Sequence, residues 1–139
     1  MAKKVGMRSL LAGMALALGL MSGSAVASDK HEISFKEDVY PIITYRCLEC
    51  HVQGGPGMVY SGLDLQTYEG LMRGVKLRTR TQSGQQYAPV VMPGKPLLSN
   101  LLVLVSGKAG IRMPHNRRRL TKCEIDTIRK WIRQGAQNN

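Results

Sequence analysis

The sequence predicts a small all-α fold, a helical bundle connected by long loops. Two segments carry the side chains of a capping box, in which a Ser or Thr precedes a helix and a Glu follows three residues later. These pairs are Ser34 with Glu37 and Thr121 with Glu124. Apolar residues follow each pair at helical spacing. The chain shows no alternation of strand and helix patterns of the kind that predicts a parallel sheet.

The first 27 residues have the three parts of a secretory signal peptide. The segment MAKKVGMRSLLAGMALALGLMSGSAVA begins with basic residues, continues with a short apolar run and ends in a small-residue A-x-A sequence. The apolar run is shorter than the about 20 residues that span a membrane, and an uncleaved membrane anchor is the alternative. We therefore expect cleavage after about Ala27, export to the periplasm, and a single mature domain over residues 28–139.

The mature chain is expected to be basic. The full sequence has a formal net charge of +11, and removal of Lys3, Lys4 and Arg8 with the signal peptide leaves +8. Such a surface suits nucleic acid, anionic lipid or an acidic protein partner, and export makes nucleic acid the least suitable of these. The three cysteines are an odd number, so at least one of them lies outside any set of disulfide pairs.

In the first half of the mature chain, a helix is predicted to begin after Ser34 and to lead directly to Cys47. Pro41 is expected to kink or restart this helix because proline lacks an amide donor. Residues 53–62 are rich in glycine and have no period, which predicts a loop. Residues 67–73 predict a short helix, ended by the glycine that follows.

The second half begins with a polar segment, residues 76–88, which we expect to be an exposed insertion, either a hairpin or a mobile loop. Residues 99–106 predict a further helix. The final helix is the best specified, since it begins after Thr121 with a capping box and is expected to end at Gly135. Its apolar face consists of Ile125, Ile128 and Ile132, with Trp131 beside them.

The segment YRCLECHVQGG contains Cys47, Cys50 and His51. This C-x-x-C-H pattern is the attachment signature of a c-type haem. Two cysteines three residues apart on a helical turn lie on one face, where each can add to a vinyl group at one edge of the porphyrin. The adjacent His51 then offers an imidazole nitrogen to the iron. The motif therefore predicts one covalently bound haem c.

Three other interpretations of this motif compete with haem. A dithiol oxidoreductase also uses C-x-x-C, but its βαβ context is absent from the pattern of this chain. A zinc site needs a fourth ligand, which Cys123 or His115 could supply, but zinc modules usually carry two matched ligand pairs. A plain disulfide between Cys47 and Cys50 would leave His51 as an ordinary surface residue.

A haem that carries electrons usually has a second axial ligand, often a methionine. Met113 is the preferred candidate because it lies 62 residues after His51, far enough to wrap round a haem, and precedes a proline that stiffens its backbone. Met92, which also precedes a proline, and His115 are the alternatives. The remaining candidates are better explained by loop or core packing or by a terminal position; they are Met58, Met72 and His31.

With these residues identified, the chain resembles the class I c-type cytochromes and, within them, the planctomycete-type cytochrome c domain. The matching pieces span about residues 34–136 and are SFKEDVYPIITYRCLECH, SGLDLQTYEGLMRG, PVVMPGKPLLSNLL, RMP and LTKCEIDTIRKWIRQGA. The resemblance implies a cytochrome c-like helical bundle around one covalently bound haem, with the first and last helices crossing beside it. It also implies that Met113, in the late Met-Pro pair, is the distal ligand of the iron.

The chain departs from the family pattern at several positions. Val52 stands where a glycine commonly follows the haem histidine, and Met92 stands where a valine commonly precedes Pro-Gly. His115 replaces a second proline after the Met-Pro pair, so a bis-histidine haem is the alternative ligation. Residues 76–88 look like an insertion.

The function we expect is that of a monohaem c-type cytochrome, an electron-transfer protein and not an enzyme. It would carry single electrons in the periplasm, as a soluble carrier or as a subunit of a redox complex, including one at the membrane. The alternative is a haem-based ligand-binding or sensor module with a replaceable sixth ligand. Cys123 is expected to be an exposed free thiol in the last helix.

Basic residues crowd around Met113 in the sequence: Arg112, Arg117, Arg118, Arg119 and Lys122. If Met113 ligates the iron, we expect these cations at the rim of the haem pocket, where they would orient an acidic redox partner. A solvated loop without a binding role is the alternative.

Overall fold

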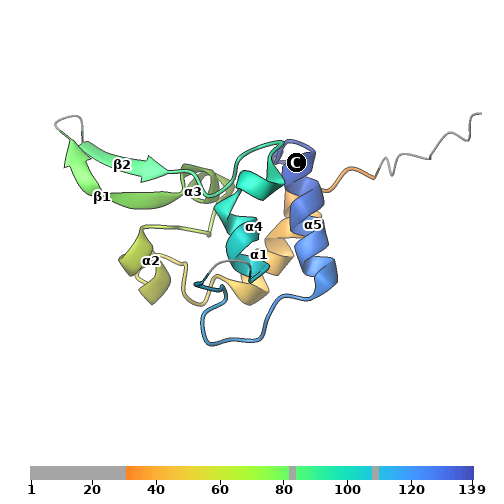
Figure 1. The fold of residues 1–139 in the computed structure, drawn as a ribbon, viewed down its shortest axis with the longest axis horizontal. Helices are drawn as coiled ribbons and strands as arrows, with labels where there is room; N and C mark the ends of the chain where they lie inside the picture. The colour runs from red at the N-terminus through yellow and green to blue at the C-terminus, as the bar shows by residue number, and fades with distance from the viewer. Residues whose placement is uncertain (1–30, 82–83, 108–109) are drawn as a thin grey trace, which may run out of the picture. The chain divides into compact units, whose positions relative to one another are not determined.

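The computed structural model describes residues 31–139 apart from 82–83 and 108–109 (Figure 1). The predicted signal peptide and its cleavage site lie outside the described residues. Within the described part of the chain, no helix has the length and the apolar character needed to cross a membrane.

The prediction of an all-α, cytochrome c-like bundle is wrong. The described residues form a mixed structure, in which five short α-helices accompany a two-stranded antiparallel sheet. The sheet arises from residues 75–88, where apolar or Thr side chains alternate with basic ones along VKLRTRT, a period of two that suits a strand. A two-stranded hairpin needs no long-range partner for its backbone groups, so it can stand beside helices without being part of a larger sheet.

The first helical segment begins after Ser34, as predicted. It consists of a π-helical turn, η1 (Phe35–Val39), followed by α1 (Tyr40–Arg46), which has Pro41 in its first turn. The amide of Glu37 donates to Ser34 Oγ at 3.2 Å. The reciprocal bond comes from Asp38 and not from Glu37, since Asp38 Oδ2 accepts from the Ser34 amide at 2.8 Å.

Two short helices follow the cysteine motif. The first, α2 (Pro56–Ser61), contradicts the loop predicted for this region, and it begins at a proline and ends at Gly62, which has φ +71°. The second, α3 (Tyr68–Arg73), confirms the predicted helix, with Thr67 Oγ1 accepting from the Gly70 amide at 3.0 Å.

The polar insertion is a β-hairpin, which was one of the two expected forms. Strand β1 (Val75–Thr81) pairs antiparallel with β2 (Gly84–Ala88), with Val75 opposite Ala88 and Lys76 opposite Tyr87. Figure 1 shows the hairpin extending away from α1, α4 and α5. The guanidinium of Arg73 lies 5.2 Å from the centre of the Tyr87 ring and ties the base of the hairpin to α3.

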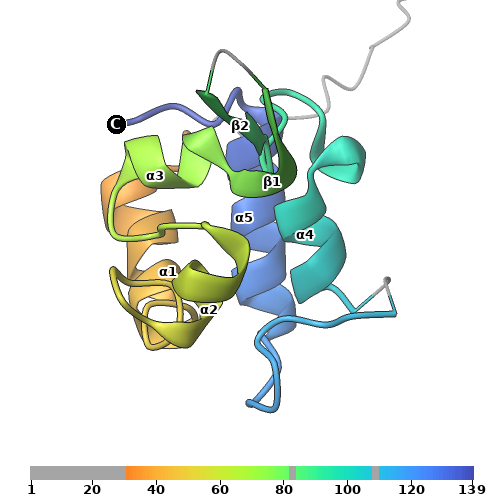
Figure 2. The same ribbon diagram turned by 90° about the vertical axis from the view of Figure 1, so that its left-hand side faces the viewer.

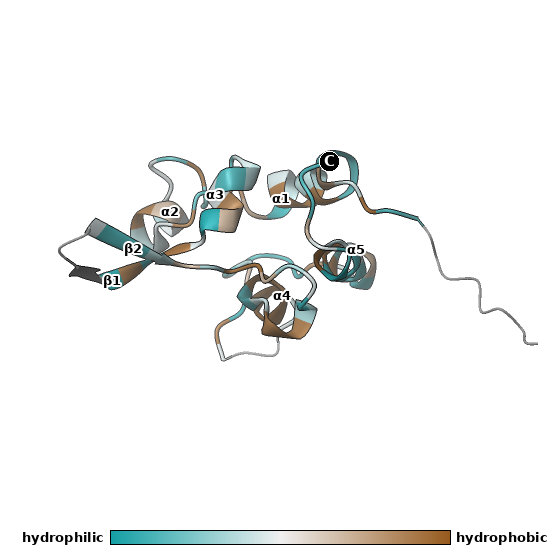
Figure 3. Ribbon diagram, turned by 90° about the horizontal axis from the view of Figure 1, so that it is seen from above, coloured by the Kyte–Doolittle hydropathy of each residue, from teal (hydrophilic) through white to brown (hydrophobic). Residues whose placement is uncertain are grey.

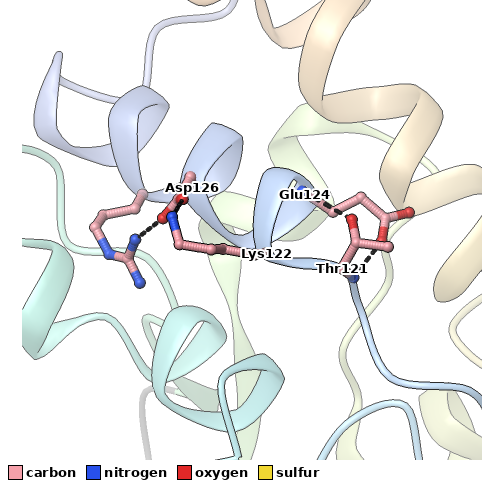
Figure 4. Close-up of polar contacts among 5 residues, drawn as sticks. Thr121, Lys122, Glu124 and Asp126 are labelled. Atoms are coloured by element: carbon pink, nitrogen blue, oxygen red, sulfur yellow. Dashed lines mark hydrogen bonds and ion pairs between the residues drawn. The ribbon is translucent and has the colours of Figure 1, made fainter.

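The remaining elements are the 3₁₀ turn η2 (Pro96–Leu98), α4 (Asn100–Val105) and α5 (Lys122–Arg133). Figure 3 shows the apolar colour of α4, in keeping with its sequence NLLVLV. The capping box of Thr121 and Glu124 is present in full (Figure 4). At the other end of α5, the amides of Gly135 and Ala136 bond back to the carbonyls of Ile132 and Trp131, at 3.1 and 2.9 Å, so Gly135 ends the helix as predicted.

The core is organised around Trp131, which is fully buried on α5. The ring of Phe35 lies 5.5 Å from the Trp131 ring and 5.2 Å from that of Tyr68, so the first and last helical segments are joined by aromatic contacts. The hydroxyl of Tyr68 donates to the carbonyl of Ala136 at 2.7 Å. Helix α5 packs against both η1 and α4 (Figure 2).

Candidate functional site

The cysteine motif lies in a hydrogen-bonded turn directly after α1. The amide of Cys47 still bonds to the carbonyl of Ile43, at 2.8 Å. The amides of Cys50 and His51 both donate to the carbonyl of Cys47, at 3.1 and 3.0 Å. These bonds keep the turn tight and helix-like, as the interpretation of the C-x-x-C-H spacing requires.

The imidazole of His51 is oriented by its backbone surroundings. Its Nδ1 lies 3.1 Å from the carbonyl oxygen of Leu63. Because a carbonyl oxygen can only accept, Nδ1 carries the hydrogen, and the lone pair of Nε2 is left to bind a metal. A backbone carbonyl as the partner of the second ring nitrogen is the usual arrangement for a metal-ligating histidine.

Gly57, in the first turn of α2, makes room for this ring. A Cβ placed on Gly57 would lie 2.9 Å from both Cε1 and Nε2 of His51 and 2.9 Å from the carbonyl oxygen of Cys50. Any residue larger than glycine would therefore force the imidazole or the cysteine turn to move.

The cysteine motif opens onto a cavity of about 410 Å³, a size within the about 300–1,000 Å³ typical of small-molecule sites. Its walls come from segments far apart in the sequence: the end of α1, the cysteine turn, α2, the start of β1, α4 and residues 113–117. Cys47, Cys50 and His51 line one part of it. The apolar residues of the wall are Pro56, Leu63, Leu65, Val75, Val90, Leu101, Leu104, Val105 and Pro114.

The same cavity is lined by Met113 and His115, so the structure brings the predicted proximal and distal candidates to one space. The amide of Met113 donates to the carbonyl of Leu104 at 3.2 Å, which ties this irregular segment to α4. Met92 is not among the residues that line the cavity. Its amide instead donates to Ser99 Oγ at 2.9 Å, in the turn before α4.

Burial raises the pKa of the Cys47 thiol to about 11. A dithiol oxidoreductase needs the opposite, a lowered pKa that yields a thiolate at neutral pH. None of the three cysteines forms a disulfide, and Cys123 is exposed on α5 as predicted. Among the described residues, no three His, Cys, Asp or Glu side chains gather as they would for a bare metal ion, so the zinc interpretation lacks its ligand set.

Two ion pairs flank the cavity. Arg46 Nε lies 2.8 Å from Glu124 Oε1 and links the end of α1 to the start of α5. Burial alone would raise the pKa of Glu124, but the hydrogen bonds from Arg46 and Thr121 outweigh it and lower that pKa below its ordinary value. The second pair joins Arg117 to Glu49.

The basic residues expected around Met113 are divided between two places. Of that group, only Arg117 lines the cavity that contains Met113. Arg112, Arg119 and Lys122 line a different cavity, between α4 and α5. The prediction of a single basic rim is therefore replaced by two separate clusters of charge.

Sequence reasoning missed the residues that position His51. The carbonyl of Leu63 carries no side-chain signal, so only the structure could identify it. Helix α2, which contributes Gly57, did have a signal: GPGMVYSG places a proline at the start and a glycine at the end, the typical asymmetry of a short helix.

The set of donors and the cavity together fit a c-type haem. Two thiols, an imidazole with a free Nε2 and a thioether meet in one mostly apolar space. Comparison of the chain with family models, curated proteins and solved structures finds no match. The family resemblance therefore stays a prediction, and the functional argument depends on the geometry of this site.

Proposed function

We propose that this chain binds one haem c covalently and carries single electrons as a monohaem c-type cytochrome. The observation that carries the proposal is the shared cavity. Residues of the C-x-x-C-H motif and Met113, 62 residues later, line the same apolar space of about 410 Å³. Periplasmic export and an acidic redox partner belong to the same proposal and rest on the sequence.

In this proposal, Cys47 and Cys50 hold the haem through thioether bonds, so that it cannot dissociate. His51 offers Nε2 to the iron, with its ring fixed by the bond from Nδ1 to the Leu63 carbonyl. Met113 offers its thioether sulfur as the second axial ligand, which raises the reduction potential.

The haem iron, when bound, supplies one-electron chemistry. The chain's own contribution is a fixed ligand set and an apolar wall. Leu65, Val90 and Leu101 are buried at the cavity and limit access of water to it. A dry surrounding and two preset ligands keep structural change on electron transfer small, and they leave no position for an organic substrate.

The proposal is tested by replacing each candidate distal ligand in turn. We expect Met113→Ala to abolish the methionine-to-iron charge-transfer band of the oxidised protein, to lower the reduction potential and to allow the reduced protein to bind carbon monoxide. Met92→Ala is the matched control, because Met92 precedes a proline like Met113 but does not line the cavity. It should leave the spectrum and the potential unchanged.

His115→Ala separates the two distal alternatives. It should leave the charge-transfer band in place, since Met113 is the proposed ligand. Loss of a bis-histidine spectrum in His115→Ala would contradict the role of Met113. Immediate binding of carbon monoxide by the reduced wild-type protein would favour a sensor with an open sixth position.

A further inference from the structure

A second cavity, separate from the cysteine site, lies between α4, the segment before α5 and α5 itself. It encloses about 470 Å³. The residues that line it are Val105, Ser106, Gly107, Arg112, Arg119, Leu120, Lys122, Ile125, Asp126 and Arg129. Val105 is the one residue that the linings of the two cavities share.

The lining of this second cavity carries four cations and one carboxylate. Asp126 pairs with Lys122, whose Nζ lies 2.6 Å from its Oδ2 (Figure 4), and also with Arg129. Arg112 and Arg119 have no acceptor among the described residues, and the buried Nε of Arg112 makes no hydrogen bond there. The cavity therefore has a net positive charge and two guanidinium groups that the chain itself does not pair.

Gathering like charges around a hollow is unfavourable unless an anion offsets the repulsion. A guanidinium presents a planar fork of donors that matches the oxygens of a phosphate or carboxylate group. Val105, Leu120 and Ile125 supply an apolar part of the wall, against which charge-assisted hydrogen bonds are stronger than in open water.

We propose that this cavity binds a small multivalent oxyanion of the phosphate class, held by Arg112 and Arg119 and aided by the charges of Lys122 and Arg129. The site shares no ligand-bearing residue with the cysteine cavity. It therefore stands whether or not the chain carries haem.

The test is titration of the purified full chain with inorganic phosphate, followed by calorimetry at an ionic strength held constant with chloride. We expect saturable binding of one phosphate. Arg119→Gln should weaken it about tenfold, the effect of losing one strong charge-assisted contact. Arg118→Gln is the matched control, because it removes the same charge from the adjacent position but lines neither cavity; it should change the affinity less than twofold.

Thermal unfolding provides a second measurement. A ligand that binds only the folded state raises its stability, so phosphate should raise the melting temperature of the wild type more than that of Arg112→Gln. Absence of saturable binding at millimolar phosphate would contradict the proposal. Equal weakening by Arg118→Gln and Arg119→Gln would also contradict it, because it would show a response to overall charge alone.

Discussion

At the scale of single residues, the site depends on the backbone around His51. The Leu63 carbonyl selects the tautomer that leaves Nε2 available, and the absence of a side chain at Gly57 gives the imidazole its space. The cysteine motif could be recognised from sequence because its spacing is itself the chemical requirement. The residues that orient its histidine could not, since a carbonyl and a missing Cβ have no distinctive spacing.

Gly57→Ala tests this role directly. Overpacking costs about 1–3 kcal/mol, whereas the better helix propensity of alanine returns at most about 1 kcal/mol. We therefore expect a net loss of about 1 kcal/mol in the free energy of unfolding, together with a changed haem absorption spectrum.

Gly110→Ala is the control for that substitution, because a Cβ at Gly110 meets no atom within 4 Å. It should change the stability by no more than about 0.5 kcal/mol and leave the spectrum intact. Unchanged stability and spectrum in Gly57→Ala would show that this glycine does not shape the histidine site.

At the scale of elements, helix boundaries were predictable wherever a capping side chain or a terminating glycine marked them. The start of α5 at Thr121 and its end at Gly135 follow from such local signals, as does α3 after Thr67. Helix α2 was missed because its glycine-rich composition outweighed its proline start. The hairpin was placed correctly but left undecided against a mobile loop, because its alternation is polar and points to no apolar core.

The pairing of Glu124 with Arg46 and Thr121 joins two elements and gives a pH dependence. The pKa of Glu124 is lowered in the folded protein, so its contribution is complete above the pKa of the unfolded chain and is lost as the pH falls through the lower folded value. We expect Glu124→Gln to lose about 1 kcal/mol at pH 7, with the loss shrinking under acidic conditions.

Urea unfolding of both proteins across the acidic range measures this difference. Glu37→Gln is the control, since the carboxylate of Glu37 is exposed and only its amide is bonded to Ser34. A loss in Glu124→Gln that stays constant down to the lowest pH would contradict the assigned role of the charge.

The hairpin is expected to be dispensable for the site. Among its described residues only Val75 lines the cysteine cavity, and the Arg73–Tyr87 contact lies at its base. Replacing Leu77–Gln86 with Asn-Gly keeps Val75 opposite Ala88 and supplies a two-residue hairpin turn. The shortened protein should retain its spectrum and stay within about 1 kcal/mol of the wild type in stability. Loss of the haem spectrum would show that the hairpin has a part in the site.

At the scale of the whole molecule, the site is a product of long-range packing. Met113 reaches the cavity of His51 because the segment before α5 is tied to α4 through the Leu104 carbonyl, and α5 is tied to the first helical segment through Phe35 and Trp131. Sequence alone ranked Met113 above Met92 from chain length and a following proline. The decision between them needed the fold, because both methionines share the same local pattern.

The whole-molecule view also separates the two sources of charge. Residues adjacent in sequence, Arg117 and Arg119, face different cavities, so the basic segment serves two places and not one rim. Such a division follows from how an irregular segment turns between α4 and α5. Composition could show the charge but not how it is distributed in space.

The central claim is that Cys47 and Cys50 hold a haem covalently, and the mass of the denatured protein tests it most directly. The protein should be produced with its export segment in a host that has haem-attachment machinery, then reduced, denatured and weighed by mass spectrometry. The account predicts an added mass of one haem that survives denaturation, persists in Cys123→Ser and is absent from Cys47→Ser/Cys50→Ser. A wild-type polypeptide with no added mass, and with three reactive thiols after reduction, would contradict it.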